Sequence, residues 1–288
     1  MNLWTFLAVQ PVYFLVLATV LGLLVGSFLN VLVHRLPIML ERQWQREAQE
    51  VLDLPLVEHD RFNLSLPASH CPHCGHRIRP WENIPLLSYL VLRGRCSACK
   101  GAISARYPLV ELACAGLSLV VAWHFGPGVQ ALAALLLTWC LLALSLIDAE
   151  QQILPDVLVL PMVWVGLIVN AFGVFVTLDA ALWGAVLGYL SLWSVYWLFK
   201  LVTGKEGMGY GDFKLLALIG AWGGWQVLPV TLVLSSVVGA LIGLCLLRWR
   251  KASLGTAMPF GPYLAIAGWI AVLWGDEMYA SYLQLLGF

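Results

Sequence analysis

Long apolar runs separated by short polar connections make up most of the chain. A helix that crosses a membrane needs about 20 mainly apolar residues, with a range of roughly 17–25. By this measure we expect eight spans, at residues 11–33, 108–125, 129–147, 157–177, 180–201, 213–224, 226–247 and 260–275. The sixth is short and contains the glycine-rich stretch LLALIGAWGG, so we expect it to be tilted or packed inside the bundle. The pattern predicts an all-α polytopic membrane protein.

One long polar segment interrupts this pattern and divides the chain into three parts. We expect a first transmembrane helix at 1–33, a loop domain at 34–106 and a seven-helix transmembrane domain at 107–288. The first 33 residues contain no Lys or Arg. A secretory signal needs a positively charged start, so we interpret the first apolar run as a retained span.

Composition supports a membrane protein and argues against a nucleic-acid partner. Of 288 residues, 61% are hydrophobic and 11% are charged, and the mean hydropathy is +0.85. Soluble domains are roughly 45–50% apolar and about 25% charged. The formal net charge is zero, so no electrostatic feature indicates nucleic-acid binding.

The distribution of positive charge predicts the orientation. All 16 Lys and Arg residues fall in the long loop or at connections that eight spans place on its side of the membrane. The opposite connections, near 126–128, 178–179 and 225, contain only Asp179 as an ionisable residue. Because Lys and Arg resist translocation, we expect the long loop to be cytoplasmic and both termini to face outward.

Four cysteines in the long loop have the spacing of a zinc ribbon or knuckle. They form two C-x2-C pairs, Cys71 with Cys74 and Cys96 with Cys99. Four thiolates suit the tetrahedral geometry of Zn²⁺, and disulfides are rare in the cytoplasm. We therefore expect a Zn²⁺ ion bound by all four; a redox centre built from the two pairs is the alternative.

The surroundings of these cysteines indicate a structural metal. A shell of four thiolates leaves no open position for substrate. Because this shell is complete, we interpret His73 and His76 as exposed loop residues, with ligand substitution as the alternative. Gly75 directly follows the first pair, Gly101 comes two residues after the second, and both are expected to form the tight turns of the knuckles.

Two aspartates stand where predicted spans end and begin. Asp148 ends the third span in LSLIDAEQQILPD, and Asp212 begins the sixth in GYGDFKLLA. The predicted topology brings both to the cytoplasmic rim, where ionisable groups at membrane depth are costly and usually functional. Paired carboxylates can share one proton, so that one activates a water while the other polarises a carbonyl. The alternatives are an interfacial residue for Asp148 and a helix-start residue for Asp212.

The neighbours of the two aspartates carry further expectations. Gly209 and Gly211 lack a Cβ atom and are expected to let a substrate or another helix approach Asp212 closely. We expect Lys214 to reach toward lipid headgroups and Asp156 to cap the span that begins after Pro155.

Several segments together resemble a known family. GYGD at 209–212 resembles the GxGD signature of intramembrane aspartyl proteases. The chain as a whole resembles the bacterial type IV prepilin peptidases, which are bifunctional leader peptidases and N-methyltransferases of type IV pilus and type II secretion systems. The matching segments are GSFLNVLVHRLP (26–37), CPHCGHRIRPWENIPLLSYLVLRGRCSAC (71–99), ISARYPLVEL (103–112), LIDAEQQILPD (146–156), GMGYGDFKLLALIGAWGGW (207–225) and MPFGPYLA (258–265).

The resemblance implies a specific enzyme. Asp148 and Asp212 would be the catalytic aspartyl pair of an eight-span protein in the bacterial inner membrane. Prepilins and pseudopilins would lose a short basic leader on the cytoplasmic side, and the new N-terminal amine would be methylated from S-adenosyl-L-methionine. Glu111 begins the second span near the same rim; it either binds the substrate amine or leader or is a plain interfacial residue.

The methyl-donor site is the least defined part of the sequence. No glycine-rich loop comes after a strand, so a Rossmann-type donor site is not expected. The long loop is the only sizeable aqueous segment. Within it, Arg93-Gly94-Arg95 either contacts the carboxylate of the donor, with Gly94 as the cofactor-binding candidate, or forms a turn against anionic lipid.

Two other functional classes compete with the enzyme. A proton-coupled transporter also uses intramembrane acids and broken helices, although it places them near the midplane and often has internal repeats. A membrane-anchored zinc scaffold would use the loop to bind a partner and would not need either aspartate. The sequence does not determine the oligomeric state.

Overall fold

A computed structural model describes residues 6–7, 9–55, 60–205, 207–250 and 259–285. Within these ranges the regular structure is helical, apart from two isolated β-bridges in the long loop. Residues 1–5 and 8 of the first predicted domain, and Lys251 of the charge count, lie outside the described residues. The elements are α2 (Pro11–Val51), η1 (Pro80–Asn83), α3 (Leu87–Val91), α4 (Arg106–Phe125), α5 (Val129–Gln151), α6 (Asp156–Ala171), α7 (Leu178–Thr203), α8 (Tyr210–Gly223), α9 (Val227–Arg250) and α10 (Gly261–Leu285).

Each of the eight predicted apolar runs falls on a helix, although the run 157–177 extends past the end of α6 at Ala171. Among the described residues, five helices are long and apolar enough to cross a membrane, namely α2, α4, α5, α7 and α9. The apolar helices α6 and α10 are shorter over their apolar parts, at Asp156–Ala171 and Gly261–Gly275. The fold is therefore an all-helical membrane protein.

The chain forms two compact units, Met1–Ala131 and Leu132–Phe288. In the first, α2 packs against α4, and two glycines make the contact close. A Cβ atom on Gly22 would lie 2.9 Å from Cα of Ala115, and one on Gly26 would lie 2.8 Å from Cα of Glu111. Small residues at such positions let helix backbones approach in membrane proteins.

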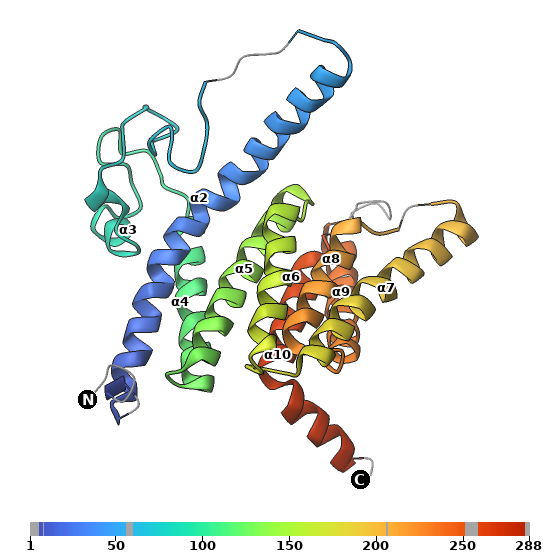
Figure 1. Cartoon of the computed structure of the whole chain (residues 1–288). Helices are drawn as coiled ribbons and strands as arrows, with labels where there is room; N and C mark the ends of the chain where they lie inside the picture. The colour runs from blue at the N-terminus through green and yellow to red at the C-terminus, as the bar shows by residue number, and fades with distance from the viewer. Residues whose placement is uncertain (1–5, 8, 56–59, 206, 251–258, 286–288) are drawn as a thin grey trace. The chain divides into compact units, whose positions relative to one another are not determined.

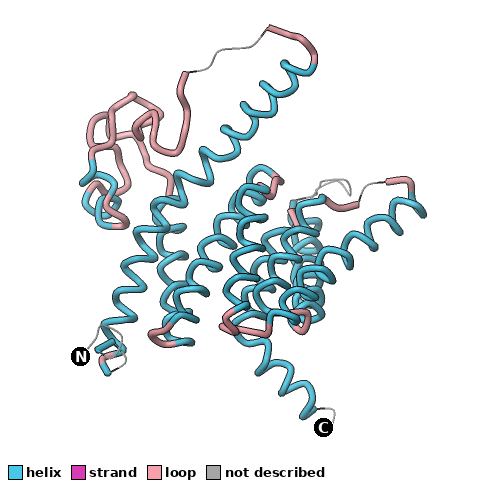
Figure 2. Tube along the Cα trace, in the orientation of Figure 1, coloured by secondary structure: helices cyan, strands magenta, loops and turns pink. Residues whose placement is uncertain are grey.

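Helix α2 continues well past the apolar run 11–33 and ends at Val51. Its second half is rich in Glu, Gln and Arg, which are good helix formers. Gln43 Nε2 donates to Glu47 Oε1 at 2.9 Å, one turn along the helix. The polar segment therefore begins as helix, and Figure 2 shows that the chain between α2 and α4 is mostly loop.

The second unit is a bundle in which successive helices alternate in direction (Figure 1). Helix α8 lies at its centre: every residue from Asp212 to Gly224 is buried except Lys214. Side chains of α5, α6, α7, α9 and α10 share one apolar core with α8. The expectation that this short helix is packed inside the bundle is confirmed.

Contacts between backbones hold α7 against α8. A Cβ atom on Gly184 would contact the carbonyl oxygen of Gly220, and one on Gly220 would contact that of Gly184. One turn further along, a Cβ atom on Gly188 would lie 2.6 Å from the carbonyl oxygen of Leu216. Gly184 and Gly188 form a GxxxG pair, a motif that brings membrane helices together.

A buried asparagine forms hydrogen bonds with the C-terminal end of α8. Asn170 Nδ2 donates to the carbonyl oxygens of Ala221 at 2.9 Å and Trp222 at 3.0 Å. Its Oδ1 accepts from the backbone N–H groups of Phe175 at 3.1 Å and Val176 at 3.2 Å. The last carbonyls of a helix lack partners within the helix, so Asn170 satisfies groups that burial would otherwise make costly.

Candidate functional site

Asp148 and Asp212 are brought together at one end of the bundle in the second unit. Asp148 lies in the last turn of α5, and Asp212 lies in the first turn of α8. Both side chains are buried, with 6% and 8% of their surface exposed. They are close enough for an electrostatic interaction between their carboxyl groups. Two carboxyl groups that are far apart in sequence therefore lie near each other in a largely buried setting.

The carboxyl group of Asp148 has a specific partner. Its Oδ2 atom accepts a hydrogen bond of 3.0 Å from the backbone N–H of Gly261, the first residue of α10. The site is thus built from three helix ends: the end of α5 and the beginnings of α8 and α10. Gly261 is a site residue that the sequence did not single out, although it lies in the matching segment MPFGPYLA.

The glycines before Asp212 have different surroundings. A Cβ atom on Gly211 would lie 2.8 Å from Cβ of Leu154, so the loop between α5 and α6 packs directly on the first turn of α8. Among the described residues, a Cβ atom on Gly209 would meet only Asp212, with Oδ2 4.0 Å away. The close neighbour at Gly211 is therefore a loop residue, whereas Gly209 is not closely packed by the described residues.

Aromatic rings support the beginning of α8. The ring of Tyr196 on α7 lies 5.1 Å from that of Tyr210 and 5.6 Å from that of Phe213, measured between centroids. The Tyr196–Phe213 pair has the edge-to-face geometry that is favourable at such distances, and the Tyr196–Tyr210 pair is tilted. Together with the glycine contacts, they fix the helix turn that carries Asp212.

Lys214 and Asp156 form an ion pair, which corrects two expectations. Lys214 Nζ lies 2.7 Å from both carboxylate oxygens of Asp156. Lys214 therefore reaches the first turn of α6 rather than lipid headgroups. Asp156 is the first residue of α6, and the N-cap is Pro155. A negative charge in the first turn of a helix is favoured by its dipole.

The four loop cysteines converge in the first unit. The Sγ atoms of Cys71, Cys74, Cys96 and Cys99 all lie within 4.8 Å of one another. The distance between Cys71 Sγ and Cys99 Sγ is 3.9 Å. A tetrahedron with Zn–S bonds of about 2.3 Å has sulfur–sulfur edges of about 3.8 Å, so the cluster fits a zinc ion.

Two similar hairpins position the thiols. His70 and Arg77 form an isolated bridge around the first pair, and Arg95 and Ala102 form one around the second. The backbone N–H groups of His73 and then Cys74 lower the pKa of Cys71 to about 7. At Cys71 this favours the thiolate that a metal requires, whereas burial and the neighbouring thiols raise the pKa of Cys74 to about 11.

The tight turns of the hairpins lie at Gly75 and Lys100. Gly75 has φ +70° as expected, but in the second hairpin the corresponding left-handed residue is Lys100, with φ 60°. The expectation that Gly101 forms the tight turn is therefore wrong. Gly101 is needed for space, because a Cβ atom there would lie 3.1 Å from Cδ2 of His73.

His76 is part of a small polar network beside the cluster. Its Nε2 atom lies 3.3 Å from Glu82 Oε2 and 3.3 Å from Ser97 Oγ. The backbone N–H of Arg79 donates to Glu82 at 2.8 Å and, with the Ser97 and His76 contacts, lowers the pKa of Glu82 to about 2. His76 is thus partly buried and paired, whereas His73 is exposed.

The side chain of Glu111 is hydrogen-bonded within the first unit. It is buried, and its Oε2 atom accepts a 2.9 Å hydrogen bond from the backbone N–H of Leu86. Leu86 has φ 59°, so the carboxylate supports a strained turn just before α3. This contact fixes the loop to α4 and differs from both roles expected for Glu111.

Gly94 stands in the turn that leads into the second cysteine pair. It has φ +66°, and a Cβ atom there would lie 2.9 Å from the hydroxyl oxygen of Tyr89. Its N–H donates to the carbonyl of Tyr89 at 2.9 Å, and its carbonyl accepts from Ile103 at 2.8 Å. These contacts give Gly94 a packing role in the loop.

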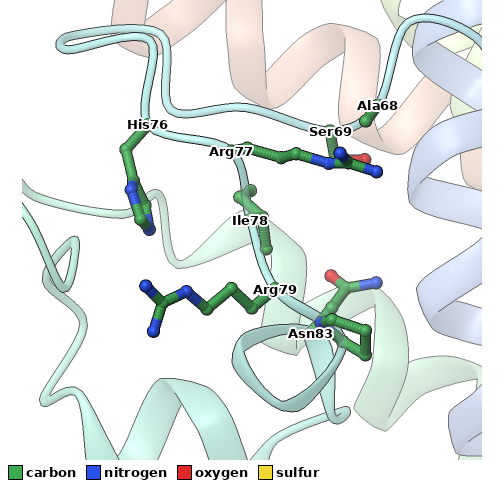
Figure 3. Close-up of a pocket in the computed structure, with 8 residues that line it drawn as sticks. Ala68, Ser69, His76, Arg77, Ile78, Arg79 and Asn83 are labelled. Carbon is green, nitrogen blue, oxygen red and sulfur yellow. The ribbon is translucent and has the colours of Figure 1, made fainter.

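A groove of about 560 Å³, lined by both polar and apolar residues, opens beside the first cysteine hairpin (Figure 3). Its lining includes Ser69, His76, Arg77, Arg79 and Asn83, and it does not include Gly94. In Figure 3 the side chains of Arg77 and Arg79 extend in different directions from the same segment. The volume lies within the range of small-molecule sites, which is about 300–1,000 Å³.

Comparisons with known proteins cover the whole chain. The Bacterial Peptidase A24 N-terminal domain matches residues 20–125, and the Type IV leader peptidase family matches residues 135–244. The chain is 76% identical to a prepilin leader peptidase/N-methyltransferase of Pseudomonas putida over 288 residues, which is 100% of both chains. Proteins of the same name from Pseudomonas aeruginosa and Dichelobacter nodosus are 67% and 51% identical, over 100% and 89% of this chain and 100% and 90% of their own.

No solved structure matches the chain. The three relatives are peptidases by name, so the transporter alternative gains no support from them.

Proposed function

The chain belongs to the type IV leader peptidase family, and on this premise we propose that it is a bifunctional membrane enzyme. It cleaves the leader of type IV prepilins and then methylates the new N-terminal residue. Pseudopilins are processed in the same way. The observation that carries this proposal is the pair of buried, interacting carboxyl groups in a chain 76% identical to a named prepilin leader peptidase/N-methyltransferase.

Asp148 and Asp212 are the catalytic pair of the proposed peptidase. Two buried carboxyl groups that interact electrostatically favour a state in which they share one proton. The ionised group takes a proton from a water molecule, whose oxygen attacks the scissile carbonyl. The protonated group donates its proton to the carbonyl oxygen. Collapse of the tetrahedral intermediate breaks the C–N bond. The proton taken from water passes to the leaving amine, and one hydroxyl proton of the intermediate returns to the aspartate that protonated the carbonyl.

The proposed setting is the bacterial inner membrane, crossed by eight helices. The first span lies within 1–33, the zinc-binding loop domain is 34–106 and the catalytic domain is 107–288. The loop domain and both aspartates face the cytoplasm. The all-helical fold and the sorting of Lys and Arg to one side support this arrangement. A prepilin has an apolar segment in the bilayer and a charged leader outside it, so a site at the cytoplasmic rim meets their junction.

Both cofactors are assigned to the loop domain. Cys71, Cys74, Cys96 and Cys99 hold Zn²⁺ in a closed shell, and the ion supplies folding energy to a loop with little regular structure of its own. S-adenosyl-L-methionine supplies the methyl group. The candidate for its site is the turn at Gly94.

Purified protein in detergent, incubated with a prepilin and S-adenosyl-L-methionine, tests the proposed function. Mass spectrometry should detect loss of the leader and then a mass gain of one methyl group on the mature chain. A prepilin whose leader is already removed should be methylated without cleavage. An intact prepilin after prolonged incubation would contradict the peptidase, and a cleaved but unmodified product would contradict the methyltransferase.

Replacing Cys71 by serine should remove the metal and impair methylation. Loss of one thiolate opens the tetrahedral shell, so metal analysis should fall from about one zinc ion per chain to nearly none. Exposed Cys245 lies outside the cluster, and its replacement by serine is the matched control that should keep the ion. Full zinc content in the Cys71→Ser variant would show that the cluster is not the metal site.

A further inference from the structure

The beginning of α10 contacts Asp148 through its backbone. The N–H of Gly261 donates to Asp148 Oδ2 at 3.0 Å, and both residues are buried. Phe260, the residue before α10, accepts the first hydrogen bonds of the helix, because its carbonyl accepts from the N–H groups of Tyr263 and Leu264 at 3.1 Å each. The first N–H groups of a helix have no partner within it, so that of Gly261 is available for the carboxyl group.

The contact requires a residue without a side chain. A Cβ atom on Gly261 would lie 2.6 Å from Oδ2 and 3.0 Å from Cγ of Asp148. Gly261 is not among the glycines with positive φ, so its backbone conformation is open to other residues. The need for glycine therefore comes from the close approach of the carboxyl group.

The position of α10 is itself well defined. Trp269 Nε1 on α10 donates to Thr138 Oγ1 on α5 at 2.8 Å. Leu264, in the first turn of α10, is fully buried in the apolar core that includes α8. The donor at Gly261 is thus held by contacts to the two helices that carry the aspartates.

From this geometry we propose that Gly261 is a positioning residue for Asp148, an inference that rests on the proposed function. Its N–H holds Oδ2 in place and leaves Oδ1 for the reacting water. The missing side chain allows the carboxyl group to sit against the start of α10. A hydrogen bond from a helix start favours a negative oxygen, which suits the carboxyl group that receives a proton from water.

Two substitutions test this inference. Gly261→Ala keeps the N–H but places a methyl group where Oδ2 lies. Gly261→Pro also places a Cβ atom there and in addition removes the N–H, and proline is tolerated at the first position of a helix. Gly239→Ala, on α9, is the matched control. Its Cβ atom would make an ordinary contact at 3.4 Å with Cδ2 of Tyr263, which lies in the same first turn of α10 as Gly261.

Cleavage of a prepilin and methylation of a pilin without its leader should be measured for all four proteins. We expect kcat for cleavage to fall roughly 10- to 100-fold in both Gly261 variants, because a small displacement of a reacting group has an effect of this order. We expect KM to stay within about threefold, methylation to be unchanged, and Gly239→Ala to match the unsubstituted protein.

The outcomes separate this inference from the proposed function. A kcat near that of the unsubstituted protein in either Gly261 variant would overturn the positioning role, even if Asp148→Asn abolishes cleavage. Loss of methylation together with cleavage would also overturn it, because the substitution would then act on the whole fold. Failure of the unsubstituted protein to cleave would instead refute the proposed function.

Discussion

Replacing Asp148 or Asp212 by asparagine is expected to abolish leader cleavage while methylation of a pilin without its leader continues. Asparagine has nearly the shape of aspartate but can neither take a proton from water nor donate one as an acid. Loss of one member of a catalytic unit lowers kcat on the order of 10⁴-fold or more. Single-turnover cleavage, monitored by mass spectrometry, measures this loss, and the rate of methylation reports whether each variant is folded.

Asp179→Asn is the matched control for this experiment. Asp179 is an exposed aspartate in the first turn of α7, so it resembles Asp212 in its place on a helix but not in burial. Its replacement should leave cleavage within about twofold, as for a surface substitution. Substantial cleavage by either the Asp148 or the Asp212 variant would remove the proposed mechanism, and it would favour the zinc scaffold instead.

Gly220→Leu is expected to destabilise the second unit strongly. The backbones of α7 and α8 touch at Gly184 and Gly220, so a leucine side chain has no space unless the helices separate. Overpacking of a core typically costs about 1–3 kcal/mol, and we expect at least about 3 kcal/mol here because rigid backbone blocks the new side chain. Because α8 carries Asp212, cleavage should be lost together with the fold.

Thermal unfolding in detergent, with the yield of monodisperse protein, measures this effect. Gly116→Leu provides the control, because Gly116 on α4 is exposed and a Cβ atom there would have no neighbour within 4 Å among the residues that the structure describes. It should unfold at nearly the same temperature as the unsubstituted protein. If Gly220→Leu also unfolds at that temperature, the close packing of α7 and α8 is wrong.

The sequence predicted those features that depend on local pattern. Apolar runs identified the helices, because each run must satisfy its backbone hydrogen bonds internally if it spans a membrane. The C-x2-C pairs identified the cysteine cluster, since their spacing alone brings two thiols to each knuckle. Topology placed Asp148 and Asp212 at the same end, and the structure brings them within electrostatic reach.

Features that depend on contacts between distant segments were missed. The hydrogen bond from Gly261 to Asp148 joins residues 113 positions apart. The ion pair between Lys214 and Asp156 could not be predicted, because it depends on how α6 and α8 are placed relative to each other. One missed feature had a visible signal: GAVLG at 184–188 is a GxxxG motif, and it indicated that α7 would contact a helix closely. The turn at Lys100 in the second cysteine hairpin had no such signal in the sequence, because lysine seldom adopts a positive φ.

The most direct test of the catalytic pair is single-turnover cleavage by the double variant Asp148→Asn/Asp212→Asn, compared with each single variant on the same prepilin. Residues that act as one unit have strongly non-additive effects. If the two carboxyl groups work together on one proton, the double variant should cleave no more slowly than the slower single variant. Losses that multiply in the double variant, as for two independent sites, would contradict the pair.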